Sequence, residues 1–445
     1  MLALGAFIAA YSGSLTESLD SLINPEIANG SLIGVVVMRT DGTELYSMMG
    51  NTRMVPASNQ KILSAVRAFD ELGPDFRFET KFWRDGNNVW IDAPGDLTIT
   101  ASQLKEIRSQ LGVDGSGRVY VRQAYRFESG PSWELDDMPF RYSPAVTALC
   151  VDRAQFVVSN SEGIPTVPDW AGVRLRHIPG PKPSQTSYSR EQGLVTIRGK
   201  IDPKVASLGV FALPDPDRAA ARIFGRSFQP VAQVPNREPD AIILSPRLAE
   251  YAKLCLEPSD NLLAESLFLT GSKTTNYSQA QRTMTESFLK IPGVKPGGLR
   301  PDDGSGLSRH NLVTPRTLAQ LLRHAYSKPY RDDFIQALPA SGEGTLRSRL
   351  AGLRVTAKTG TLDVVSCLSG YAWPRSGEPV IFAVMMNHHV FSSAQARQMQ
   401  DTIVETVLQS LDSERLDNDN AKWCDPVEED VSNPRSPRPH GNRIP

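Results

Sequence analysis

Pro56-Ala57-Ser58-Asn59-Gln60-Lys61, followed by ILSAVRAFDEL over residues 62–72, organises the predicted fold. Apolar side chains cover most of the circumference of a helix drawn through this segment, which is typical of a central, buried helix. Gly73 and Pro74 predict where it ends. Ser58 and Lys61 stand one turn apart near its start, because residues i and i+3 are neighbours on a helix surface. The sequence therefore predicts a core helix that carries a paired hydroxyl and amine.

Outward from this helix, the pattern of apolar residues changes twice. Residues 31–38 and 44–49 predict two strands joined by a tight turn. Residues 75–240 consist mainly of short alternating runs between Gly- and Pro-rich turns, with one helix expected at 102–111. Beyond them, helices are expected at 258–270, 314–327 and 393–411, and strands at 355–359, 367–373 and 380–387. The prediction is an α/β (α+β) fold interrupted by a large, mostly β insertion.

The composition excludes several classes of protein. The 445 residues include 48 Lys plus Arg against 49 Asp plus Glu, so a nucleic-acid partner, which normally requires a basic excess, is not expected. No apolar run is long enough to cross a bilayer, so no transmembrane segment is expected. Four cysteines are too few for a disulfide scaffold in a chain of this length. These numbers predict a multi-domain globular protein.

The two ends of the chain differ from the rest. Residues 1–16 carry no charge and begin with an apolar run, which is typical of a signal or leader segment, although a basic beginning is missing. Residues 412–445 contain few apolar side chains and many Pro, Asp, Glu, Asn and Arg residues. This segment, which includes Cys424, is predicted to be a disordered tail because it buries too little surface to offset chain entropy.

Familiar cofactor and metal motifs are absent from the sequence. There is no GxxxxGK[ST] loop, GxGxxG turn, HExxH or paired CxxC, and therefore no metal or organic cofactor is expected. The serine elbow GxSxG is also missing. His388 and His389 lack the spacing of metal ligands and are interpreted as an ordinary surface pair.

A serine activated by a lysine remains as the candidate chemistry. Ser58 lies at a helix start, where free N–H groups stabilise a developing oxyanion. Lys61 can act as its base only if its pKa falls from about 10.4 toward neutrality. The SxxK pattern also occurs at Ser102 and Ser287, and for any one copy a helix cap or a solvated face is the ordinary explanation. Only Ser58 opens a helix apolar enough to be central.

Two further motifs distinguish Ser58 from those alternatives. Ser259-Asp260-Asn261 lies at the start of a predicted helix, where a helix cap is the simpler explanation of its serine. Lys358-Thr359-Gly360-Thr361 lies near the end of a predicted strand. It supplies a cation, hydroxyls and a glycine that permits close approach to the backbone. The order SxxK, SxN, KTG is far more specific than its parts.

These motifs and their surroundings resemble the class C low-molecular-mass penicillin-binding proteins, the DacB-like D-alanyl-D-alanine carboxypeptidases/endopeptidases. The resemblance extends over residues 29–411. Its segments are PASNQKIL (56–63), GDLTIT (95–100), WELDDM (133–138), VTIRG (195–199), SDNLLAE (259–265), DGSGLSRHNLV (303–313) and AKTGTL (357–362).

The resemblance implies a β-lactamase/transpeptidase-like domain, formed by residues 17–73 and 241–411, whose antiparallel sheet is flanked by helices. It also implies two insertions between the first two motifs. Residues 74–98 with 167–240 would form inserted domain II, and residues 99–166 would form inserted domain III.

The same resemblance assigns roles to the three motifs. Ser58 would be the acylated nucleophile and Lys61 its base. Ser259 would relay the proton to the leaving amine, and Asn261 would hold Lys61 and the substrate amide. Lys358 would keep the local potential positive. The N–H groups of Ser58 and Thr361 would form the oxyanion hole. Thr359, Gly360 and Thr361 would receive the terminal carboxylate.

A side-chain subsite is implied with less support. Asp137 matches a carboxylate that meets the amino group of a diaminopimelate-type side chain, although a solvated turn residue is an equally simple explanation. Tyr142 matches an aromatic wall and Arg309 an arginine of this subsite. Asp363 stands where some relatives carry Gln, which puts the detailed side-chain specificity in question.

The expected function is therefore a serine DD-peptidase that cleaves peptidoglycan stem peptides as a D-Ala-D-Ala carboxypeptidase, a cross-link endopeptidase, or both. β-Lactam antibiotics would inhibit it, and it would work in the periplasm or another extracytoplasmic space. A β-lactamase or esterase on the same scaffold and a non-catalytic peptidoglycan-binding protein are the alternatives.

Overall fold

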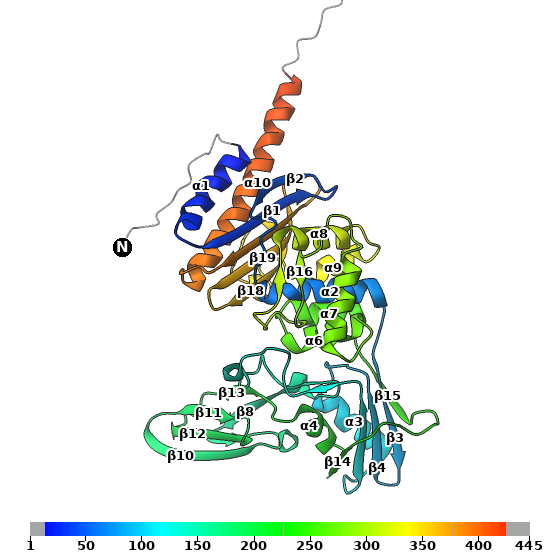
Figure 1. Ribbon diagram of the computed structural model, residues 1–445. Helices are drawn as coiled ribbons and strands as arrows, with labels where there is room; N and C mark the ends of the chain where they lie inside the picture. The colour runs from blue at the N-terminus through cyan, green and yellow to red at the C-terminus, as the bar shows by residue number, and fades with distance from the viewer. Residues whose placement is uncertain (1–13, 226, 376, 424–445) are drawn as a thin grey trace, which may run out of the picture.

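The computed structural model describes residues 14–225, 227–375 and 377–423 (Figure 1). The leader predicted for residues 1–16 falls almost wholly outside this range, as do Cys424 and the rest of the tail from residue 424. Helix α1 (Leu15–Ala28) begins at the far end of that predicted leader. No helix among the described residues has the length and apolarity needed to cross a bilayer.

A five-stranded antiparallel sheet forms the centre of the upper part of the molecule (Figure 1). Its strand order is β18-β19-β20-β1-β2, so strands from the two ends of the chain lie side by side. The strands are β1 (Leu32–Arg39), β2 (Glu44–Met48), β18 (Arg354–Leu362), β19 (Val365–Trp373) and β20 (Val380–Asn387). Strand β18 is at the edge of the sheet, where its residues 355–357 pair with the segment 339–341.

Helices cover both faces of this sheet. On one face, Val35 and Val37 of β1 pack in a core with α1 and with α10 (Ser393–Trp423). On the other face, Val36 and Met38 join a core with α2 (Gln60–Leu72) and α8 (Pro315–Tyr326). This double burial explains the continuous apolar run in β1, since a strand buried on both faces does not alternate. Helices α5 (Leu248–Leu256), α6 (Asn261–Gly271), α7 (Tyr277–Phe288) and α9 (Arg331–Ala337) complete the helical layer around α2.

Helix α2 is central, as its sequence predicts. Its residues from Gln60 to Phe69 are all buried, and Gly271 of α6 lies so close that an added Cβ would stand 2.8 Å from Ala68 Cα. The helix starts later than expected, because residues Ala57–Asn59 form a 3-10 turn, η1, and Ala57 has a positive φ of 46°. The turn places Ser58 just before the helix proper.

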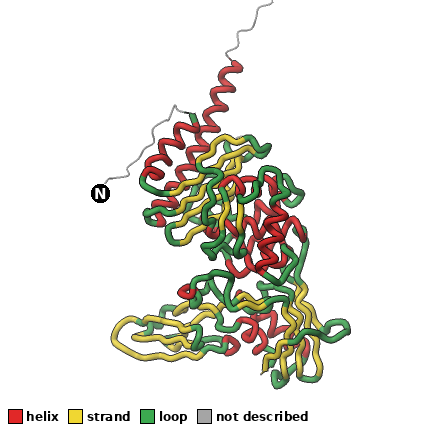
Figure 2. The backbone as a smooth tube through the Cα atoms, viewed as in Figure 1, coloured by secondary structure: helices red, strands yellow, loops and turns green. Residues whose placement is uncertain are grey.

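The chain between α2 and α5 forms the β-rich lower part of the molecule (Figure 2). A five-stranded sheet has the order β14-β5-β4-β3-β15, and two three-stranded sheets have the orders β10-β12-β11 and β13-β8-β9. The elements are β3 (Glu79–Asp85), β4 (Asn88–Ala93), α3 (Ala101–Leu111), β5 (Arg118–Gln123), β8 (Gln155–Ser161), β9 (Ile164–Thr166), β10 (Arg174–Pro183), β11 (Gln185–Ser189), β12 (Leu194–Lys200), β13 (Ser207–Ala212), α4 (Pro216–Arg222), β14 (Ser227–Pro230) and β15 (Ala241–Leu244). Short pairs are formed by β6 (Arg126–Phe127) with β7 (Val146–Thr147) and by β16 (Leu299–Arg300) with β17 (Leu312–Val313).

Strand pairing does not follow the predicted division of this insertion at residues 98 and 166. Strand β4 pairs with β5, and β8 pairs with β13, although the prediction assigned the members of each pair to different inserted domains. The pairing favours one unit around residues 79–123 with 227–244 and another around residues 155–212. Pairs that join segments so far apart cannot be inferred from local alternation.

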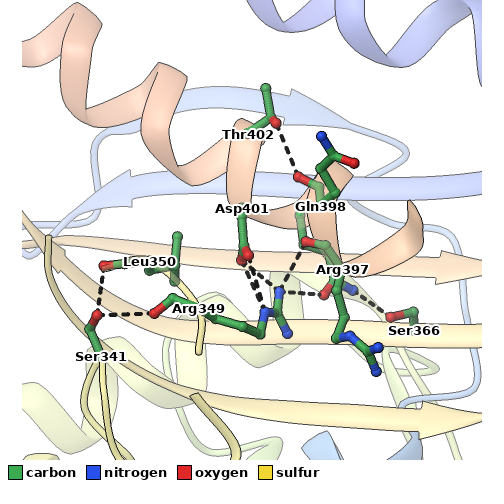
Figure 3. A network of polar contacts seen from close by, with 9 residues as sticks. Ser341, Arg349, Leu350, Ser366, Arg397, Gln398, Asp401 and Thr402 are labelled. Atoms are coloured by element: carbon green, nitrogen blue, oxygen red, sulfur yellow. Dashed lines mark hydrogen bonds and ion pairs between the residues drawn. The ribbon is translucent and has the colours of Figure 1, made fainter. Parts of the chain in front are cut away.

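Helix α10 extends beyond its predicted end at residue 411 and continues to Trp423, so residues 412–423 of the predicted disordered tail are helical. The sequence contains no Gly or Pro between residues 393 and 423 that would terminate it. Arg349, in the loop before β18, holds this helix (Figure 3), with its Nη2 atom 2.7 Å from Asp401 Oδ1 and 3.0 Å from Gln400 Oε1. Gln400 in turn donates to Ser366 Oγ on β19 at 2.9 Å.

Candidate active site

A cleft of about 780 Å³ lies beside the edge strand β18 and brings together residues from distant parts of the chain. Of the residues predicted for the site, its lining contains Ser58, Asp137, Tyr142, Ser259, Asn261, Arg309 and Thr361. Lys61, Lys358, Thr359 and Gly360 are not part of the lining. Lys61 and Lys358 are completely buried directly behind it. The three predicted motifs therefore converge, with the hydroxyl groups at the surface and the amines beneath.

Ser58 and Lys61 form the pair that their spacing predicts. Lys61 Nζ lies 2.8 Å from Ser58 Oγ. Burial lowers the pKa of Lys61, although the carboxyl groups of Asp303 and Glu265 oppose that shift. The other two SxxK copies differ, because Lys105 is exposed on α3 and Lys290 is exposed in the turn that follows α7. Only the Ser58 copy therefore has the burial that can turn a lysine into a base.

The remaining contacts of Lys61 define what its amine can do. Nζ lies 2.6 Å from Asn261 Oδ1 and 2.7 Å from the carbonyl oxygen of Ser305. Asn261 Nδ2 donates to the Tyr142 carbonyl oxygen at 2.8 Å, which fixes the amide orientation. Asn261 Oδ1 and the Ser305 carbonyl oxygen can only accept hydrogen bonds, whereas the Ser58 hydroxyl can accept or donate. A neutral Lys61 can therefore donate to the two carbonyl oxygens and direct its lone pair at the Ser58 proton.

Ser259 lies outside the helix that the sequence predicted for it. Helix α6 begins at Asn261, and Asp260 is its cap, accepting from the Leu263 N–H at 3.0 Å. Ser259 has a left-handed φ of 64°, an uncommon conformation for a residue other than glycine and one that is enriched at functional sites. The serine thus lines the cleft instead of capping the helix, which corrects the simpler explanation of this motif.

Lys358 and Gly360 of β18 pack directly against the turn that carries Ser58. Asn59 Nδ2 donates to the Lys358 carbonyl oxygen at 3.0 Å. An added Cβ at Gly360 would stand 2.8 Å from the Pro56 carbonyl oxygen and 3.0 Å from the Ser58 nitrogen. Burial, reinforced by the nearby Lys61, lowers the pKa of Lys358 well below its usual value. The absence of a side chain at Gly360 therefore allows β18 to pack against the turn that carries Ser58. The sequence had predicted that it would allow a ligand to approach the backbone.

Two buried acidic residues that the sequence did not assign to the site, Glu265 and Asp303, lie behind Lys61 and hold the loop that contacts it. Glu265 accepts from the N–H groups of Gly304 and Ser305, each at 2.9 Å. Asp303 accepts from the N–H groups of Gly306 at 2.7 Å and Ser308 at 2.8 Å, and from Trp133 Nε1 at 2.9 Å. These bonds fix the loop whose Ser305 carbonyl oxygen contacts Lys61. Glu265 lies in the segment SDNLLAE and Asp303 in DGSGLSRHNLV. An acidic residue among mainly apolar or small neighbours was the signal in the sequence that could have identified each of them.

The predicted side-chain subsite is assembled in part. Tyr142 donates to Asp137 Oδ1 at 2.7 Å, and both residues line the cleft. Arg309 Nε donates to Glu134 Oε1 at 2.9 Å, and its Nη1 donates to the Asp363 carbonyl oxygen at 3.1 Å. Arg309 therefore joins the loop around residue 134 to the end of β18, and Glu134 is an additional cleft residue that the sequence did not reveal.

His389 is the other residue that the sequence interpretation misplaced. It was expected in a surface pair, but only His388 is exposed, whereas 6% of His389 is accessible and the residue lines the cleft. The local sequence gives no signal for this difference, because both residues follow a buried strand. The difference arises from His388, whose φ of 56° turns the chain at that point.

Comparison with known proteins places most of the chain in one family. The family model described as D-Ala-D-Ala carboxypeptidase 3 (S13) matches residues 15–409. A D-alanyl-D-alanine carboxypeptidase of Actinomadura sp. strain R39 is 28% identical over 87% of this chain and 83% of its own length. A penicillin-sensitive carboxypeptidase A of Dictyostelium discoideum is 31% identical over 82% of this chain and 83% of its own length.

Solved structures share the fold. The crystal structure of penicillin-binding protein 4 (DacB) from Haemophilus influenzae superposes with a TM-score of 0.71 at 22% identity, covering 89% of this chain and 99% of the other. Its complex with a novel β-lactam superposes with a TM-score of 0.68. The transpeptidase-like fold that the resemblance implied, with the β-rich insertion that the pattern of short alternating runs predicted, is therefore confirmed.

Proposed function

The chain belongs to the D-Ala-D-Ala carboxypeptidase 3 (S13) family and is a serine-type carboxypeptidase acting on peptidoglycan, and on this premise we propose that Ser58 is its acylated nucleophile. The observation that carries the assignment is the 2.8 Å contact between Ser58 Oγ and the buried Lys61 amine. A serine hydroxyl becomes an effective nucleophile only when an adjacent base removes its proton.

In the proposed acylation, Ser58 Oγ attacks the carbonyl carbon of the penultimate D-Ala while Lys61 takes the hydroxyl proton. The carbon–nitrogen bond then breaks, and Ser259 passes a proton to the leaving amine. The N–H groups of Ser58 and Thr361 stabilise the oxyanion, a contribution of about 3–4 kcal/mol per donor in other enzymes. Water hydrolyses the resulting ester and regenerates Ser58.

The remaining predicted residues take supporting roles in this proposal. Asn261 holds Lys61 and hydrogen-bonds the substrate amide, and Lys358 keeps the local potential positive. Thr359 and Thr361 bind the terminal carboxylate. Asp137 and Tyr142, with Arg309, receive a diaminopimelate-type side chain, for which the Tyr142–Asp137 hydrogen bond at the cleft supplies an ordered carboxylate.

The test is the intact mass of the protein after incubation with benzylpenicillin, beside the Ser58→Ala variant. The expected result is an adduct on the wild type alone, since a β-lactam carboxylate and carbonyl present the same groups as D-Ala-D-Ala. A folded wild type without an adduct and with the antibiotic untouched would contradict the assignment. Consumption of the antibiotic without an adduct would indicate a β-lactamase instead.

The proposed site of action is the periplasm or another extracytoplasmic space, because peptidoglycan is assembled there. Endopeptidase cleavage of cross-links is proposed beside carboxypeptidase action, since both reactions use the same acylation step. Incubation with cross-linked muropeptides, followed by separation of the products, measures the endopeptidase reaction. A reporter fused to the chain that remains in the cytoplasm would contradict the proposed location.

A further inference from the structure

Three successive residues of the inserted region, Asp152, Arg153 and Ala154, have left-handed backbone conformations. They form the 3-10 turn η3 (Asp152–Ala154), with φ angles of 49°, 55° and 54°. None of them is glycine, and other L-residues normally visit this region singly, because their Cβ comes too close to the following carbonyl oxygen. Such strain persists only where surrounding contacts enforce it, and it is enriched at functional sites. The proposed mechanism gives this turn no role.

Contacts on both sides hold the turn in place. The Asp152 N–H donates to the Ile99 carbonyl oxygen at 2.9 Å, and Asp152 Oδ1 accepts from the Ala101 N–H at 3.1 Å. Val151, directly before the turn, is buried in the core of the inserted region, whereas Ala154 is buried in the core that contains α2. The turn is therefore fixed at the junction between the inserted region and the part of the molecule that carries the nucleophile.

The turn directs one charged side chain, that of Arg153, to the Ser259-Asp260-Asn261 motif. Arg153 Nη1 lies 3.5 Å from Asp260 Oδ2, and the Asp260 side chain is only 9% accessible. The other oxygen of this carboxylate, Oδ1, caps α6 by accepting from the Leu263 N–H at 3.0 Å. Arg153 therefore binds the carboxylate oxygen that the helix cap does not use, and the two contacts together fix the orientation of the Asp260 side chain.

The two neighbours of Asp260 differ in how firmly they are held. Asn261 has hydrogen bonds of its own, to the Lys61 amine and to the Tyr142 carbonyl oxygen. The Ser259 hydroxyl has no hydrogen-bond partner among the residues that the structure describes. Ser259 also has a left-handed φ of 64°. The direction of its hydroxyl therefore depends on the backbone that Asp260 anchors, whereas the Asn261 amide has separate support.

We propose that Arg153 is a positioning residue for Ser259 and acts through the Asp260 carboxylate. This step rests on the proposed function, in which Ser259 passes a proton to the leaving amine. Arg153 is not part of the cleft lining, so it does not bind the substrate. A side chain of the inserted region thus controls proton delivery in the catalytic cleft, and this use explains why a strained turn is maintained at the junction.

The test compares a peptide ending in D-Ala-D-Ala with the thioester of the same acyl group. The peptide nitrogen leaves as an amine and needs a proton, whereas a thiol has a pKa of about 8.5 and its sulfur can leave as the thiolate. For Arg153→Met we expect kcat/KM for the peptide to fall about tenfold, a partial loss of general-acid catalysis. The thioester value should stay within about twofold of the wild type, whereas a general loss of structure would lower both values.

Three further variants make the result specific. Arg153→Lys returns a cation and should restore part of the peptide rate. Asp260→Asn removes the charge from the other side of the contact, and adding Arg153→Met to it should cause no further loss if Arg153 acts through Asp260. Arg118→Met is the matched control, since Arg118 is an exposed arginine on β5 of the inserted region.

Three outcomes would overturn the role of Arg153 and leave the proposed function intact. These are an unchanged peptide value in Arg153→Met, equal losses on the two substrates, and losses that add in the double variant. A wild type that hydrolyses neither substrate and forms no penicillin adduct would overturn the proposed function, and the role of Arg153 with it.

Discussion

Gly360 stands so close to Ser58 that a methyl group on its Cα would lie 3.0 Å from the Ser58 nitrogen. The same methyl group would lie 2.8 Å from the Pro56 carbonyl oxygen. Both neighbours are backbone atoms, which cannot turn aside as a side chain does. The contact sets the separation between the nucleophile turn and β18, and hence between the two N–H groups proposed for the oxyanion hole.

Gly360→Ala should therefore separate β18 from the Ser58 turn. We expect acylation by benzylpenicillin to slow by about 10²–10³-fold, the effect of losing one oxyanion donor. Overpacking should cost about 1–3 kcal/mol of unfolding free energy. Gly180→Ala is the matched control, since its added Cβ would meet no atom closer than 3.6 Å. Stopped-flow acylation and urea unfolding measure the two effects, and wild-type acylation in Gly360→Ala would contradict the argument.

Acylation should depend on pH through Lys61. Burial lowers the pKa of this amine, and only its neutral form can take the Ser58 proton. The rate of adduct formation should therefore be retained above the lowered pKa and lost as pH falls through it. Lys61→Met should reduce the rate by about 10²–10⁴-fold and flatten the profile.

Lys290→Met is the control for this experiment, because Lys290 belongs to another SxxK copy and is exposed. Its rate and pH profile should match those of the wild type. A wild-type rate that does not change between acid and neutral pH would show that another group activates Ser58.

The contact between Ser58 and Lys61 could be predicted from sequence because the proposed chemistry fixes both residue types and spacing. Lys61 must lie one turn from Ser58 to reach its hydroxyl, and the observed contact satisfies that requirement. His389 could not be predicted in this way, since its burial depends on a chain turn at His388 and not on the residues beside it. Ser259 was placed in a helix because two adjacent residues, Ser259 and Asp260, are both good helix caps, and Asp260 takes that position.

The central sheet and helices were predictable for a related reason. Continuous apolar runs in β1 and β20 indicate strands buried on both faces. The inserted region was recognised as β-rich, but its strand order was not, because β5 pairs with β14 from more than a hundred residues later in the chain. Local alternation predicts that a strand forms but does not indicate its partner.

Glu265 should make stability depend on pH. Burial, with a further contribution from Asp303, raises its pKa from 4.5 to about 8. A raised pKa in the folded state stabilises the protein fully below about 4.5, and this contribution is lost as pH rises through about 8. The unfolding free energy measured in urea should therefore decrease over that interval.

Glu265→Gln should reduce this slope. Burial also raises the pKa of Asp303, which contributes in the same direction, so part of the slope should remain. The amide should further destabilise the fold by about 1–3 kcal/mol, because its NH₂ group would face the N–H of Gly304 or Ser305. A variant with an unchanged slope would assign the pH dependence to other groups.

Arg190, which follows β11 of the inserted region, should control substrate affinity without touching the nucleophile. Its Nη1 donates to the carbonyl oxygens of Met138 at 3.3 Å and Ser143 at 3.2 Å, which bracket Tyr142. Losing these bonds should release the loop that presents Asp137 to the cleft. For Arg190→Met we expect KM for a diaminopimelate-containing stem peptide to rise about five- to tenfold.

The acylation rate with benzylpenicillin, which lacks that side chain, should change by less than about twofold in Arg190→Met, because Ser58 and Lys61 do not contact the loop through Arg190. Arg198→Met is the matched control, since Arg198 is an exposed arginine on the neighbouring β12. An equal decline of penicillin acylation would show that the loop acts on the nucleophile through the Tyr142 carbonyl oxygen and Asn261. An unchanged KM would show that the inserted region does not position the subsite.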